Sequence, residues 1–172
     1  AAGRDVPWIR NDTLVRRGPL TIGIIGVALK ETAAETRAAN TVGLRFDDAA
    51  PVVDSIARAL RARGADAIVV LAHAGAFCSR TGSSDCAGEI NELARDLHGP
   101  VDAIVSGHTH SLVDVAVRGI PIVQAYKNGR AIGVVDLDVP RRGARRSAAI
   151  LAADTVVAPR AEVRQVRTAD YS

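Results

Sequence analysis

The sequence predicts an α/β fold, and three observations carry that prediction. Short apolar runs rich in Ile, Val and Ala recur at 21–29, 65–73 and 102–107, as expected of buried strands. Segments with helical periodicity precede the second and the third of these runs. Glycine follows each helical segment, where a helix is expected to end. This alternation favours parallel strands joined by right-handed crossovers.

The first half of the chain is predicted as a strand, a connection and a helix. The strand covers 21–29, and residues 30–46, which lack periodicity, are expected to form a surface connection. A helix is predicted within 47–64, because Asp47 or Asp48 can cap its first turn. Its apolar positions are expected to share one helical face: Val52, Val53, Ile56 and Leu60.

Further along, the strand 65–73 ends in His73, and the strand 102–107 ends just before His108. The helix between them carries its apolar positions at helical spacing: Ile90, Leu93, Ala94 and Leu97. Shorter strands are then predicted at 112–117, 120–126 and 131–139. Asn128-Gly129, a favoured turn pair, predicts that the last two of these strands form a hairpin.

The composition argues against two classes of partner. The net charge is only +3, the arginines are scattered along the chain, and aromatic residues make up 3%, so we expect no nucleic acid partner. No apolar run of about 18 residues occurs, so we expect no membrane partner. Methionine is absent, which suggests a processed or partial chain whose targeting segment stood upstream.

The two cysteines, Cys78 and Cys86, lie in a short polar stretch rich in Ser and Gly. Their spacing favours a local disulfide, which indicates an oxidising location, extracellular or periplasmic. Two alternatives remain open: a metal site shared with His73, and a pair of reduced, inert thiols.

Three of the four histidines follow predicted strands. The carboxyl ends of neighbouring parallel strands lie about 5 Å apart, so His73 and His108 can share one centre. In an extended segment His110 would point to the same side as His108. Imidazole is a ligand for Zn, Mn, Fe and Ni, so we expect a metal site here. His98, in the last turn of a helix, is interpreted as a hydrogen-bonded surface residue.

The stretch from about Pro7 to Asp138 resembles the calcineurin-like metallophosphoesterases, and within them the secreted 5′-nucleotidase and 2′,3′-cyclic-nucleotide phosphodiesterase branch. The phrases that carry the resemblance are IGIIGVALKET, NTVGLRFDDA, CAGEINELA, VDAIVSGHTH and GIPIVQAYKNGRAIGVVDLDV. GHTH after an apolar strand is the most specific of them.

The resemblance implies part of a metallophosphatase-type αββα sandwich, with mixed sheets flanked by helices. It also implies two divalent metal ions (Zn, Mn or Fe) that hydrolyse a small-molecule phosphate ester, a nucleotide, in nucleotide catabolism. In such enzymes the residues matching His73 and His108 bind one ion, and the residue matching His110 binds the other.

The sequence also departs from the family pattern. The family opens with Asp-x-His, a bridging aspartate and Gly-Asn-His, and no Asn-His pair occurs in this chain. Asp96-Leu97-His98 imitates the opening motif by coincidence, at a helix end and out of order. We therefore expect no catalytic residue in this chain, which we interpret as a fragment that is inactive alone.

The domain prediction follows from these departures. Residues 1–154 are predicted to be the C-terminal half of a catalytic domain, and 155–172 a linker toward an absent nucleotide-binding domain. The N-terminal half would belong to the same, longer chain. Two alternatives stay open: a non-catalytic module in which three imidazoles hold one metal ion, and a related dimetal hydrolase acting on a sulfur substrate.

Overall fold

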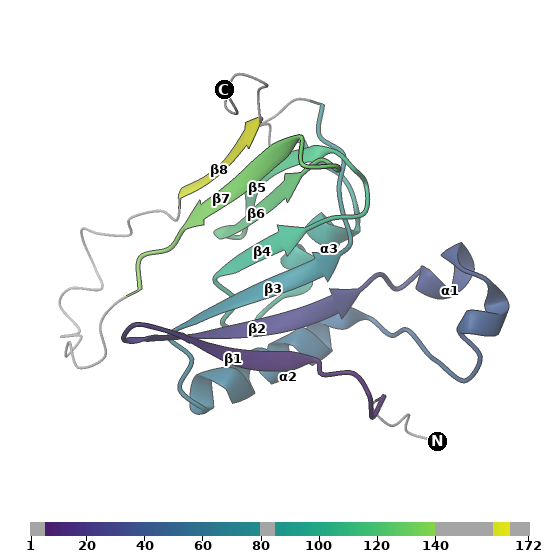
Figure 1. Ribbon diagram of the computed structural model, residues 1–172, viewed down its shortest axis with the longest axis horizontal. Helices are drawn as coiled ribbons and strands as arrows, with labels where there is room; N and C mark the ends of the chain where they lie inside the picture. The colour runs from purple at the N-terminus through teal and green to yellow at the C-terminus, as the bar shows by residue number, and fades with distance from the viewer. Residues whose placement is uncertain (1–5, 80–84, 140–159, 166–172) are drawn as a thin grey trace.

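The computed structural model describes residues 6–79, 85–139 and 160–165 (Figure 1). Its main feature is a six-stranded mixed sheet in the order β1-β2-β3-β4-β6-β5. These strands are β1 (Asp12–Arg17), β2 (Leu20–Ala28), β3 (Ala67–His73), β4 (Ala103–Ser106), β5 (Leu112–Val117) and β6 (Ile120–Ala125). The predicted α/β class, with a mixed sheet flanked by helices, is confirmed.

The centre of the sheet is parallel, as the alternation of strands and helices predicts. β2, β3 and β4 run parallel, and β6 joins them parallel to β4. The antiparallel strands β1 and β5 form the two edges. Ala28 pairs with His73, and Ala72 pairs with Ser106, so the carboxyl ends of β2, β3 and β4 lie at one edge of the molecule.

Within the described ranges, helices cover one face of this sheet (Figure 1). They are α2 (Ala49–Ala62) and α3 (Glu89–Asp96), while α1 (Thr32–Glu35) and a 3-10 turn (Ala38–Asn40) lie within the predicted connection 30–46. The core between helices and sheet is made of aliphatic side chains: Ile25, Val53, Leu60, Ile68, Ile90 and Ile104. Val52 was expected on the buried face of α2 but is 51% exposed, so that assignment is wrong.

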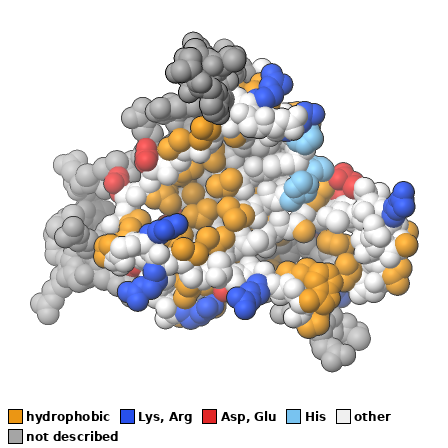
Figure 2. All heavy atoms as spheres, viewed as in Figure 1, with side chains coloured by type: hydrophobic (Ala, Val, Ile, Leu, Met, Phe, Trp, Pro, Cys, Tyr) orange, Lys and Arg blue, Asp and Glu red, His pale blue; other side chains and the backbone are white. Residues whose placement is uncertain are grey.

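The opposite face of the sheet is apolar and open to solvent (Figure 2). Side chains alternate along β3, so Ile68 and Val70 are buried beneath the helices while Leu71 is 46% exposed. Val105 of β4 is 41% exposed. A groove of about 460 Å³ runs between these strands and β7 (Ala131–Asp136). We call Val69, Leu71 and Val105 the open face.

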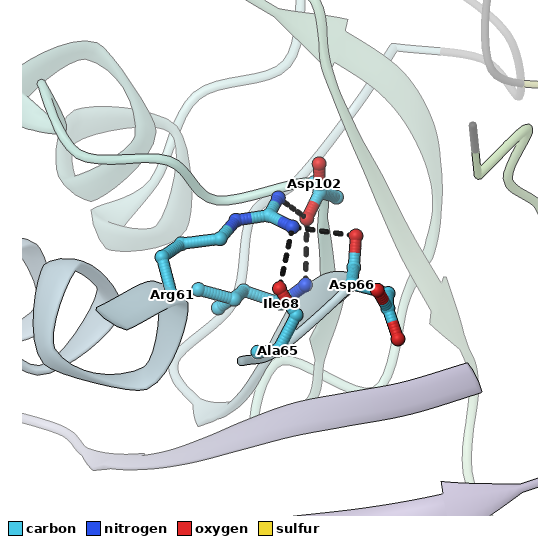
Figure 3. Close-up of polar contacts among 5 residues, drawn as sticks. All are labelled: Arg61, Ala65, Asp66, Ile68 and Asp102. Atoms are coloured by element: carbon cyan, nitrogen blue, oxygen red, sulfur yellow. Dashed lines mark hydrogen bonds and ion pairs between the residues drawn. The ribbon is translucent and has the colours of Figure 1, made fainter. Parts of the chain in front are cut away.

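Two aspartates, Asp66 and Asp102 (both labelled in Figure 3), fix the register at the amino ends of the parallel strands. The amide of Asp66 donates to the Thr21 carbonyl, and its carboxylate accepts from the amide of the same Thr21 at 2.7 Å. Asp102 bonds both backbone groups of Ile68 in the same way. Each aspartate therefore joins its own strand to one defined residue of the neighbouring strand.

Arg61, at the end of α2, connects that helix to the strand ends at which Asp66 and Asp102 lie. Its guanidinium donates to the carbonyls of Ala65 and Asp66 and to the carboxylate of Asp102 (Figure 3). Burial raises the pKa of the Asp102 carboxyl above its ordinary value, while the Ile68 amide and Arg61 act in the opposite direction. Loss of the carboxylate would leave partly buried donors without an acceptor.

The hairpin prediction for the last strands is wrong. β6 pairs with β4 and β5, whereas β7 pairs with β8 (Arg160–Gln165) in a separate two-stranded sheet. The tight hairpin joins β5 to β6 through Arg118 and Gly119, whose φ angles of 52° and 80° suit a two-residue turn. The turn signal at Asn128-Gly129 does form positive φ angles, but it leads from one sheet to the other.

Two further elements were not predicted. β1 forms an antiparallel edge beside β2. Within 155–172, predicted as a linker, residues Arg160–Gln165 form β8. Residues 155–159 and 166–172 lie outside the described part of the chain.

We expect Asp102→Ala to lower the free energy of unfolding by about 1–3 kcal/mol, because the Ile68 amide loses its acceptor and Arg61 loses its carboxylate partner. The measurement is urea unfolding followed by circular dichroism. The matched control is Asp47→Ala, which removes only an exposed ion pair with Arg45 and should change stability by less than about 1 kcal/mol. Equal losses in the two variants would contradict the role given to Asp102.

Candidate metal site at the carboxyl ends of the strands

The structure brings two of the three predicted histidines together. His73 is the last residue of β3, and His108 follows the end of β4 by two residues. Nε2 of His73 lies 3.2 Å from Nδ1 of His108, and the two ring centroids are 5.0 Å apart. Figure 2 shows histidine side chains gathered beside the apolar face, next to an acidic side chain.

The donor geometry of this pair fits a metal ion. Two imidazole ligands of one ion, each about 2.0–2.1 Å from it in a tetrahedral site, have nitrogen atoms roughly 3.3 Å apart. The two ring nitrogens of His73 and His108 stand at nearly that separation and face one another. They can alternatively share one proton in a hydrogen bond, depending on the tautomer of each ring.

His110 is placed differently from what an extended segment would give. The backbone after β4 turns, with φ of 80° at His108 and 53° at His110, so these residues do not continue the strand. These two residues therefore lack the extended backbone from which a shared side-chain direction was expected. His110 is exposed. Across the described residues, no three His, Cys, Asp or Glu side chains surround one position suited to a metal.

The carboxylate of Glu35, which the sequence analysis did not identify, lies next to the His108 ring. Oε2 of Glu35, at the end of α1, lies 3.5 Å from Nε2 of His108. Glu35 thus approaches the ring nitrogen that faces away from His73. A carboxylate in this position is typical of metal-binding histidines, whose second nitrogen often donates to an acid. No periodic pattern in 30–46 pointed to this glutamate.

The predicted disulfide is confirmed, because Cys78 and Cys86 are joined. This pairing excludes both alternatives, the shared metal site with His73 and the reduced thiols. Next to the disulfide, Phe77 and Ala87 exchange two backbone hydrogen bonds, which close the base of the loop. His98 lies two residues beyond α3, exposed, and its amide donates to Asp54.

Solved structures define the class of this fold. A calcineurin-like phosphoesterase from Bacillus subtilis, YfkN, matches with a TM-score of 0.63 at 24% identity, over 85% of this chain and 45% of that one. The sulfate thiohydrolase SoxB from Thermus thermophilus matches with a TM-score of 0.65 at 24% identity, over 92% of this chain and 25% of that one. The chain therefore has the calcineurin-like phosphoesterase fold, which confirms the resemblance found in the sequence.

Particular relatives carry the resemblance at the level of sequence. Endonuclease YhcR of Bacillus subtilis is 33% identical over 135 residues, which are 78% of this chain and 11% of that protein. Cell wall protein Lmo0130 of Listeria monocytogenes is 34% identical over 66% of this chain and 16% of its own. The trifunctional nucleotide phosphoesterase protein YfkN is 33% identical over 48% of this chain and 6% of its own.

This chain thus spans less than a fifth of each of these three relatives. No family model matches the sequence. The helices within the described ranges are too short or too polar to cross a lipid bilayer.

We expect reduction of the Cys78–Cys86 bond to lower the free energy of unfolding by about 2–3 kcal/mol, because the bond closes a short loop in the unfolded chain. Urea unfolding with and without dithiothreitol measures this difference. The double variant Cys78→Ser, Cys86→Ser should match the reduced wild type and not respond to dithiothreitol. A wild type that dithiothreitol leaves unchanged would contradict the prediction.

Proposed function

We propose that this chain is part of a metal-dependent phosphoric ester hydrolase of the 5′-nucleotidase-like kind, acting on nucleotides in nucleotide catabolism. The observation that carries the proposal is the apposition of His73 Nε2 and His108 Nδ1 at 3.2 Å, at the carboxyl ends of two parallel strands. Ligands in open α/β sheets bind outside such strand ends. YfkN, which shares the fold and is 33% identical over 48% of this chain, is named a nucleotide phosphoesterase.

In this proposal each polar residue of the site has one task. His73 and His108 hold one divalent ion, Zn, Mn or Fe, and His110 belongs to a second. The Glu35 carboxylate, 3.5 Å from Nε2 of His108, favours the tautomer that keeps the ring proton on Nε2, which leaves Nδ1 unprotonated and available as a ligand. A pair of bound ions would supply an activated water and would neutralise charge on the phosphate.

The chain alone holds an incomplete site, and the open face supports this part of the proposal. His73 points to the same face of β3 as Val69 and Leu71, because alternate residues of a strand share a face. A segment that covers Leu71 would therefore come within reach of His73. We propose that this segment precedes the present residues in a longer chain and supplies the remaining ligands, and that a nucleotide-binding domain follows β8.

Three other functions are supported by particular relatives or by the site itself. YhcR is named an endonuclease, which makes a phosphodiester in a polynucleotide a second candidate substrate. SoxB is named a sulfate thiohydrolase, which makes a sulfur ester the third candidate substrate. A non-catalytic module that holds one ion with imidazoles alone remains the competing class, and metal stoichiometry separates it from the hydrolase.

We propose an extracellular or periplasmic location for the protein. The disulfide between Cys78 and Cys86 supports it, because such bonds persist in oxidising compartments. The name of one relative, a cell wall protein, agrees with it.

We expect the chain to bind Zn²⁺ or Mn²⁺ weakly, and His73→Ala or His108→Ala to weaken that binding more than about tenfold, since each removes one of two apposed ligands. Isothermal titration calorimetry measures the affinity. His98→Ala is the matched control, because this exposed histidine lies beside α3, and its affinity should equal that of the wild type. Equal weakening by all three variants would contradict the site.

The same preparations test activity on AMP, on 2′,3′-cyclic AMP and on single-stranded DNA with added Mn²⁺ or Zn²⁺. No turnover above the metal background is expected from the chain alone. Turnover that His108→Ala abolishes would mean that this chain already contains the essential residues. One ion bound tightly, without turnover, would favour the non-catalytic module.

We expect Leu71→Lys to change the free energy of unfolding of this chain by less than about 1 kcal/mol, because its side chain is already exposed on the open face. Ile68→Ala, three residues earlier and fully buried, should cost about 2–5 kcal/mol. Urea unfolding measures both, and binding of the dye ANS should fall in Leu71→Lys. Similar losses in the two variants would mean that Leu71 is covered in this chain.

A further inference from the structure

We propose that Gln124 is a positioning residue: its buried amide holds the turn at His108–Ser111 in the conformation that sets His108 against His73. This inference rests on the proposed metal site. Gln124 belongs to β6 and is 1% exposed. Its Nε2 lies 2.8 Å from Oγ1 of Thr109, 2.9 Å from Oγ of Ser111 and 3.0 Å from the Ser111 carbonyl. Both residues that flank His110 are therefore bonded to one side chain.

The direction of these hydrogen bonds is fixed by a second residue. The hydroxyls of Thr109 and Ser111 both donate to the carbonyl of Ala76, which can only accept. Their oxygens then have only lone pairs left for Gln124, so position 124 must supply donors. A glutamine amide supplies two N–H groups, whereas an ionised glutamate of the same shape supplies none.

The turn needs this support because its backbone is strained. His108 and His110 have φ angles of 80° and 53°, in the left-handed region that residues with a Cβ rarely adopt. This conformation is costly for a residue with a Cβ, and it persists only where the surroundings fix it. The bonds from Gln124 and to Ala76 hold the residues on either side of His110, and Thr109 also follows His108 directly.

Gly75 shows how closely this network is packed. A Cβ at Gly75 would lie 2.5 Å from Oγ1 of Thr109 and 2.7 Å from Oε1 of Gln124, and it would also collide with the Gly107 carbonyl. The chain that leaves His73 therefore runs directly against the turn that carries His108. Gln124 lies where these two segments meet, so its hydrogen bonds fix one histidine relative to the other.

The test compares Gln124→Met, which keeps the volume but removes the donors, with Asn91→Leu. Asn91 is a matched control, because it is also a buried amide whose oxygen has no hydrogen-bond partner among the described residues, and its amide nitrogen donates to the Cys86 carbonyl and not to the turn. The first measurement needs no metal: the nuclear Overhauser effect between the ring protons of His73 and His108. The second is the dissociation constant for Zn²⁺ by calorimetry.

We expect Gln124→Met and Gln124→Glu to lose the ring-to-ring Overhauser effect and to bind Zn²⁺ about 10–100-fold more weakly, the usual effect of removing an outer partner of a metal ligand. Asn91→Leu should keep the Overhauser effect and an affinity within about twofold of the wild type, even where it unfolds more readily. An Overhauser effect retained in Gln124→Met overturns the inference. An equal loss in Asn91→Leu also overturns it, because destabilisation alone would then suffice.

Two further variants keep the test decisive if Gln124→Met does not fold. Thr109→Val removes one hydroxyl from the network, and Gly75→Ala displaces the turn from the other side; both should lose the Overhauser effect. Retention in both overturns the inference. A wild type that shows the Overhauser effect but binds no Zn²⁺ refutes the proposed metal site, while the ring contact in the variants still decides the role of Gln124.

Discussion

The position of every residue in the candidate site depends on the register of three parallel strands. Asp66 and Asp102 set that register by bonding both backbone groups of one residue in the neighbouring strand. A shift by one residue would turn every side chain of a strand to the other face. His73 would then lie under the helices, remote from His108. The two aspartates at the amino ends of the strands thus determine that His73 and His108 lie in contact at the carboxyl ends.

The contact between His73 and His108 can be predicted from the sequence, because one sequence suffices to recognise both the ends of apolar strands and the histidines that stand there. The run that ends in His73 and the run that ends before His108 both contain the sequence Asp-Ala-Ile-Val, and the aspartates of that sequence make the register contacts. Glu35 and Gln124 could not be predicted in the same way. Glu35 lies in a connection without periodicity, and Gln124 looks like an ordinary residue of a buried strand.

The turn at Asn128-Gly129 was predicted correctly, but the strand that pairs with β7 was predicted wrongly. The reason is physical. Asn128 and Gly129 adopt the left-handed angles that their residue types favour. A turn fixes the direction of the chain over four residues, but pairing depends on which strand edges are free. Both edges of β6 are taken, by β4 and β5, so β7 pairs with β8 instead. Pairing of this kind is a property of the whole sheet.

Under the proposed function, packing on the open face and metal binding are coupled. His73 and Leu71 share one face of β3, so a segment that buries Leu71 also approaches the metal ligands. A segment that contributes a ligand binds more tightly when the ion is present, and the ion binds more tightly when the segment is in place, by the same factor. Packing of the segment on the open face and binding of the ion by the histidine pair therefore strengthen each other only in the complete protein. This reciprocity explains why two well-placed imidazoles in the present chain should bind metal weakly.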